Sequence, residues 1–142
     1  MSKTPQAAID TSMDKLNLIL KEIEEAYGWP KERRAQSYAA LRSVLHVLRD
    51  RLPVQESAEF AAQLPLIVRG LYYEGWDPAA VPMKMGREEF LDRVRQDFRR
   101  DLPGGVELLV QTTLQALHRH VTEGEWQDVK SDLPTELAAF IP

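Results

Sequence analysis

Apolar residues recur at steps of three and four along most of the chain, the spacing that places them on one face of an α-helix. The first stripe runs from Leu16 to Tyr27, and Gly28 is expected to end that helix. A second helix is expected to follow Pro30 and to continue to about Arg51. Its buried stripe is expected to consist of Tyr38, Leu41, Leu45, Leu48 and Leu52. No segment alternates apolar and polar residues as a half-buried strand does, so the pattern predicts an all-α fold.

Capping and turn residues divide the rest of the chain into shorter helices. A third helix is expected over about Val54 to Gln63. Pro65 is expected to open a fourth, which ends before Gly75. The second half has the same order, with helices marked by Phe90 to Phe98, Pro103, Thr122 and Pro134. The sequence therefore predicts about eight helices.

The two halves of the chain also resemble each other residue by residue. Segments 41–72 and 110–141 align at a constant offset of 69 positions, and five of the 32 aligned pairs are identical. The identical pairs are Leu45/Leu114, Leu48/Leu117, Glu56/Glu125, Leu64/Leu133 and Pro65/Pro134. We interpret this as an internal duplication of a four-helix unit. Because one such unit would be only marginally stable alone, we expect the two to pack into one body.

This interpretation gives the domain organisation. Residues 1–11 show no hydrophobic period and are expected to form a flexible tail, with order beginning near Ser12. The remaining residues, 12–142, are expected to form a single all-α domain. It would consist of repeat 1 (12–73), a connector (74–86) and repeat 2 (87–142).

Composition narrows the classes of function. The chain has no cysteine, which excludes disulfides, thiolate metal sites and a cysteine nucleophile. Its net charge of -4 would repel phosphate backbones and argues against nucleic acid as a partner. The first residues lack the apolar stretch of a signal peptide, and no run of about 18 apolar residues could span a bilayer. We therefore expect a cytoplasmic protein without membrane contact.

Three sequence segments carry a family resemblance. They are AQLPLIVRGLYYEGWDP at 62–78, REEFLDRV at 87–94 and a second Leu-Pro at 133–134. Together they resemble the bacterial family called domain of unknown function 2267, over roughly residues 16–141. The resemblance implies an all-helical, internally duplicated bacterial protein for which no activity is established.

Residues that often carry chemistry have ordinary explanations in this sequence. His118 and His120 are two positions apart on an expected helix and point away from each other, so they cannot hold one metal ion. We interpret these two and His46 as surface or boundary histidines. The acidic pair Glu56 and Glu59 is assigned to solvated helix surface. Thr122 with Glu125 has the spacing of a capping box. The sequence thus predicts no metal and no cofactor, and it favours a protein that is not an enzyme.

Positions at which the two repeats differ are better candidates for function. Large aromatic side chains without a counterpart are typical of interaction sites. The candidate interaction surface consists of Arg69, Tyr72, Tyr73, Trp76 and Trp126. The alternative is that the connector aromatics wedge the two units together. We expect a non-enzymatic protein-interaction or self-association module, with a small-ligand-binding protein or enzyme that has a polar pocket between the repeats as the alternative.

Overall fold

The computed structural model describes residues 4–142, and the regular structure in this range is helical throughout. Its α-helices are α1 (Pro5–Tyr27), α2 (Arg34–Arg51), α3 (Val54–Gln63), α4 (Leu66–Tyr73), α5 (Arg87–Asp97), α6 (Gly105–His118), α7 (Glu123–Ser131) and α8 (Thr135–Phe140). Short 3-10 turns η1 (Lys31–Arg33) and η2 (Pro78–Ala80) lie before α2 and after α4. The predicted all-α class and the predicted number of helices are confirmed.

Helix α1 begins at Pro5, so the prediction that regular structure begins near Ser12 is wrong. The Thr4 side chain caps the helix by accepting a hydrogen bond from the Ala7 N–H at 3.1 Å. Proline at the first helical position is compatible with this start because its missing N–H has no partner there anyway. The first turns are exposed, so no hydrophobic period marks them, and local capping sets the boundary instead. Residues 1–3 of the expected tail lie outside the described residues.

Local signals fix the other helix boundaries as well. Gly28 takes the left-handed conformation, with φ of 68°, and its N–H donates to the Glu24 carbonyl to close α1. Helix α3 has the predicted bounds, Val54–Gln63. Pro134 immediately precedes α8, as Pro65 precedes α4. These boundaries depend on a few neighbouring residues, which is why the sequence predicts them well.

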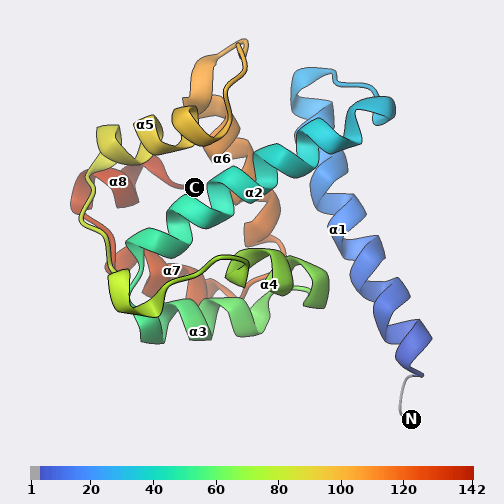
Figure 1. Cartoon of the computed structure of the whole chain (residues 1–142), viewed down its shortest axis with the longest axis horizontal. Helices are drawn as coiled ribbons and strands as arrows, with labels where there is room; N and C mark the ends of the chain where they lie inside the picture. The colour runs from blue at the N-terminus through green and yellow to red at the C-terminus, as the bar shows by residue number, and fades with distance from the viewer. Residues whose placement is uncertain (1–3) are drawn as a thin grey trace.

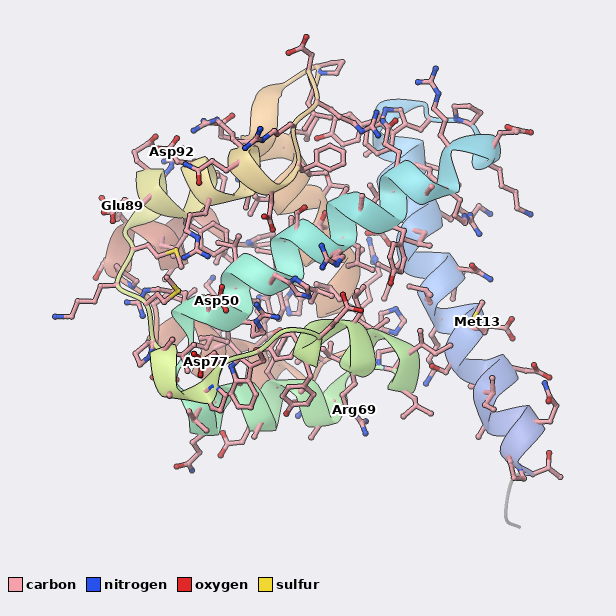
Figure 2. The ribbon with its side chains drawn as sticks, viewed as in Figure 1. Met13, Asp50, Arg69, Asp77, Glu89 and Asp92 are labelled. Atoms are coloured by element: carbon pink, nitrogen blue, oxygen red, sulfur yellow. The ribbon has the colours of Figure 1, made fainter. Side chains whose placement is uncertain are left out.

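Helix α2 crosses the middle of the molecule and contacts α1, α4, α5 and α6 (Figure 1). The leucines at 41, 45 and 48 of α2 and Leu52, which caps the helix, are all buried, as the stripe predicted. Tyr38, in contrast, is exposed because the adjacent Ser37 takes the inward position and donates a hydrogen bond to Glu24. Asp50, labelled in Figure 2, lies at the other end of α2. It pairs with Arg93 of α5 at 3.2 Å.

The two halves of the chain share one hydrophobic core, to which both contribute buried residues. Helices α3 and α7 contact each other across the halves, and α1 packs on α6 (Figure 1). Helices α2, α3 and α4 are followed by α6, α7 and α8 in matching order, although the internal duplication itself remains a prediction. Within residues 4–142, none of the helices combines the length and the apolar character needed to cross a membrane.

Candidate functional site

Two of the five residues predicted to form an interaction surface lie in the core. Tyr72 is 0% exposed, and its hydroxyl is hydrogen-bonded to the Ser57 hydroxyl at 2.9 Å. Trp126 is 1% exposed, and its indole N–H donates to the Pro142 carbonyl at 2.6 Å. Both rings pack beside Phe60, with centroids 5.6 and 6.3 Å away. The assignment of these two aromatics to a surface is therefore wrong, because the packing of α4 on α3 covers Tyr72 and the packing of α7 on α3 covers Trp126.

Arg69 has a structural role that the sequence did not reveal. Its guanidinium donates to the carbonyls of Ala61, Ala62 and Leu64 at 2.9 to 3.1 Å. These carbonyls lie at the C-terminal end of α3, where the last carbonyls of a helix lack the usual hydrogen bond from a residue four positions further on. The side chain is labelled in Figure 2 on α4. Arg69 therefore fixes the end of α3 against α4 and is held in place by this contact.

Tyr73 and Trp76 are half-buried at the start of the connector. Their ring centroids lie 5.3 Å apart, and Tyr73 also meets Tyr72 edge to face at 5.5 Å. Tyr73 packs against the hydrophobic core. This arrangement agrees with the wedge alternative for these rings, while an interaction through them stays a prediction.

An open cleft of about 530 Å³ lies where the two predicted repeats meet. Repeat 1 contributes Lys15 of α1, the end of α3 and Arg69 of α4. Repeat 2 contributes Arg119, His120 and the N-cap of α7, Thr122. In the part of the chain that the structure describes, none of the residues that line the cleft is acidic. We call it the basic cleft, and it is a polar hollow of the kind that the ligand-binding alternative requires.

The charges in the basic cleft are only partly compensated. Arg119 forms an ion pair with Glu22 at 2.9 Å, and both side chains remain partly exposed. Burial lowers the pKa of His120 below its ordinary value, and Lys15 and Arg119 nearby lower it further. Burial disfavours a charge of either sign at this ring, whereas Lys15 and Arg119 disfavour only a positive one.

A second group of titratable residues lies on the contact between α3 and α7. One carboxylate oxygen each of Glu56, Glu59 and Glu125 lies within 4.8 Å of the others. Glu59 is exposed, whereas Glu56 and Glu125 are 8% and 7% exposed. We call these three residues the carboxylate cluster. Burial is the main cause that raises the pKa of both inner carboxyls. Glu125 and Asp132 raise the pKa of Glu56 further, whereas the contact with Glu56 lowers the pKa of Glu125.

Local structure explains how Glu125 reaches this position. The predicted capping box is formed in one direction, since the Thr122 hydroxyl accepts a hydrogen bond from the Glu125 N–H at 3.3 Å. In the reverse direction, the Thr122 N–H donates to the side chain of Gln63 of α3 at 2.7 Å. The Glu125 carboxylate therefore does not take part in the cap. Glu56 has the same place in the first turn of α3, so two equivalent glutamates meet.

The three histidines lie in three separate surroundings. His118 stacks on Trp126 with ring centroids 4.3 Å apart, and its Nε2 lies 2.8 Å from a Glu123 carboxylate oxygen. His120 lines the basic cleft instead. His46 is buried rather than at the surface, and its Nε2–H donates to the Leu71 carbonyl at 2.8 Å. Burial lowers the pKa of His46, so its neutral form is favoured.

The sequence contained one unused signal for the carboxylate cluster. Of the five identical pairs in the repeat alignment, Glu56/Glu125 is the only charged one. The leucine and proline pairs are explained by a core and a helix start in each repeat, but a glutamate is not. Its assignment to solvated surface was wrong for Glu56 because α7 covers that face of α3.

One of two comparisons with known proteins gave a match. A family model described as "Uncharacterized conserved protein (DUF2267)" matches residues 17–140. A search of curated proteins found no match. The matched range includes both the basic cleft, apart from Lys15, and the whole carboxylate cluster.

Proposed function

The chain belongs to the uncharacterised conserved family DUF2267, and we propose that its function is to bind a small anionic ligand in the basic cleft. The observation that carries the proposal is the lining of the cleft. Among the described residues, 4–142, this lining includes Lys15, Arg69, Arg119 and His120 and no acidic residue. In a chain of net charge -4, a hollow lined by one sign of charge concentrates counter-ions of the other sign.

The shape and the anchoring of the cleft also support a small ligand. Its volume of about 530 Å³ falls within the usual range for small-molecule sites, about 300 to 1,000 Å³. Arg69 is held by the end of α3, so little side-chain entropy is lost when a ligand binds beside it. The Lys15 ammonium extends from α1 without such anchoring and supplies an adjustable charge. A phosphate or carboxylate group is the chemistry that these donors recognise.

Titration with inorganic pyrophosphate tests this proposal. Calorimetry at low ionic strength is expected to show saturable binding, because exposed charges are then weakly screened. The change Lys15→Ala should weaken binding about five-fold, since a partly exposed charge pair contributes about 1 kcal/mol. The NMR titration of the His120 ring is expected to show a higher pKa with pyrophosphate bound, because the anion stabilises the imidazolium.

Lys21→Ala is the matched control for this experiment. Lys21 lies on the same helix and carries the same charge, but it does not line the basic cleft. It should leave the affinity for pyrophosphate within about two-fold of the wild type, as expected for a screened charge. If Lys15→Ala and Lys21→Ala lose affinity for pyrophosphate equally, the anion is attracted by the charge of the whole molecule rather than bound at one site. That result, or the absence of saturable binding, would contradict the proposal.

Self-association is the second candidate function, with a second copy of the chain as the partner. The N-terminal part of α1 exposes Ile9 and Met13, and Leu66 is exposed at the start of α4. These two segments adjoin, because the Ile67 N–H donates to the Ser12 hydroxyl at 2.8 Å. Figure 1 shows the N-terminal end of α1 extending away from the other helices. Ile9 and Met13 lie on the same face of α1 as Leu16, which is buried against the core.

Light scattering after size-exclusion chromatography tests self-association. The wild type is expected to show a dimer fraction that rises with protein concentration, since apolar burial drives such contacts. Met13→Glu should shift the protein to the monomer, because the contact would bury an unpaired charge. Gln96→Glu, an exposed change on α5, is the control and should behave as the wild type. A wild type that is monomeric at every concentration would exclude this candidate.

A further inference from the structure

Glu56 and Glu125 place two carboxylates in the interior without compensation from the protein. Glu56 and Glu125 are both more than nine-tenths buried, and among residues 4–142 the buried Oε2 atom of each has no hydrogen-bond partner. Within residues 4–142, neither glutamate takes part in an ion pair with a lysine, arginine or histidine. Burying a carboxylate in this way is costly unless a positive group or a proton compensates it.

This burial distinguishes the carboxylate cluster from an ordinary acidic surface. Three nearby acidic residues on exposed helices would be unremarkable, since water solvates each of them. Here the Oε2 atoms of Glu56 and Glu125 are removed from water, and each of these side chains has a carboxylate oxygen within 4.8 Å of one from Glu59. The two buried glutamates come from different helices, one from each half of the chain. The missing partner is therefore expected between α3 and α7.

The spacing of the oxygens fits a metal ion. Two oxygens that share an ion at about 2.4 Å, a typical calcium distance, are at most about 4.8 Å apart. The oxygens of Glu56, Glu59 and Glu125 satisfy this limit. An all-carboxylate ligand set suits a hard cation such as Ca²⁺ or Mn²⁺, whereas zinc prefers histidine and cysteine. Because Glu59 is exposed, the site is open to solvent on one side and an ion can enter.

We propose that Glu56, Glu59 and Glu125 form a binding site for a divalent cation of the size of calcium or manganese. The ion would link the first turn of α3 to the first turn of α7 and so join the two halves of the chain. In the predicted repeat, Glu56 and Glu125 occupy equivalent positions, so one ion is bound by both copies of the same residue. The site is distinct from the basic cleft and does not depend on anion binding there.

Thermal unfolding of chelator-treated protein tests the proposal. Addition of CaCl₂ or MnCl₂ to about 100 times the dissociation constant should raise Tm by about 5 °C or more. Ionic strength is held constant with NaCl, so that general screening does not contribute. Glu56→Gln and Glu125→Gln should each lower the apparent affinity for the cation at least about ten-fold, because each removes a charged ligand.

Glu88→Gln is the matched control, because Glu88 is an exposed glutamate in the first turn of α5. It should retain the full response to the cation. The proposal is overturned if neither cation raises Tm of the wild type, or if Glu125→Gln responds as the wild type does. It is also overturned if Glu56→Gln stabilises the metal-free protein while the wild type gains nothing from either cation. The two carboxyls would then share a proton instead.

Terbium luminescence provides a test that needs no variant. Tb³⁺ binds the same oxygen ligands as Ca²⁺, and Trp126, which follows Glu125 in the chain, can sensitise its emission. Saturable emission on excitation of tryptophan, reversed by excess CaCl₂, is the expected result. Emission that does not saturate, or that calcium does not reverse, would overturn the proposal even if a glutamine variant failed to fold.

Discussion

Replacement of Trp126 by alanine is expected to lower the free energy of unfolding by about 3 to 5 kcal/mol, the usual cost of removing a fully buried tryptophan. The indole is 1% exposed and stacks on His118, and its N–H donates to the Pro142 carbonyl. The variant would lose these contacts and leave a cavity beside Phe60. Urea unfolding monitored by far-UV circular dichroism measures the change without relying on tryptophan fluorescence.

Trp76→Ala is the comparison for this variant. Trp76 is half-buried, so less apolar surface is lost and the cost should be less than half of that for Trp126. The sequence alone assigned both tryptophans to one interaction surface. Equal and small effects in the two variants would contradict the burial of Trp126 and restore it as a surface candidate.

Replacement of Arg34 by methionine is expected to cost about 3 kcal/mol at neutral pH, because it leaves a buried carboxylate without its partner. The Glu24 carboxylate is buried and accepts two hydrogen bonds from the Arg34 guanidinium, at 2.9 and 3.1 Å. Ser37 donates a further hydrogen bond to it. Methionine fills a volume similar to that of arginine, so the loss of stability reflects the missing charge rather than poorer packing. Chemical denaturation at pH 7 measures the difference between the two proteins.

The effect of this substitution should depend on pH. The hydrogen bonds from Arg34 lower the pKa of Glu24 in the folded protein below its ordinary value of 4.5. A carboxyl with a lowered folded pKa contributes stability that is fully present above the unfolded pKa. This contribution is lost as pH falls through the folded pKa. The difference between wild type and Arg34→Met should therefore be largest above about pH 5 and shrink as the pH falls towards 3.

Arg42→Met controls for the loss of an arginine from the same helix. Arg42 pairs with Glu74 at 3.1 Å, but both side chains are largely exposed. Such pairs contribute about 0 to 1 kcal/mol, so the variant should resemble the wild type. Two results would contradict the role given to the ion pair between Arg34 and Glu24. One is an equal loss of stability in Arg42→Met and Arg34→Met, and the other is a loss in Arg34→Met that does not change with pH.

The candidate site was accessible to sequence reasoning only in part. The repeat alignment singled out Glu56 and Glu125 as identical, and the capping-box spacing placed Glu125 correctly in the first turn of α7. Neither observation shows that the two carboxylates meet, because they are 69 positions apart and only the packing of α3 on α7 joins them. The basic cleft likewise collects side chains from α1, α4 and the turn after α6.

By itself, the sequence determined the helices of this protein. Apolar spacing, Pro65, Gly28 and the Thr122 cap act over a few residues, so they predict α3 at its observed bounds and the ends of most other helices. Only the tertiary structure decided which of the large and charged side chains are covered. An aromatic or a glutamate on a helix has the same local pattern whether solvent or another helix faces it. The burial of Trp126 and Glu56 therefore depends on partners far away in the chain.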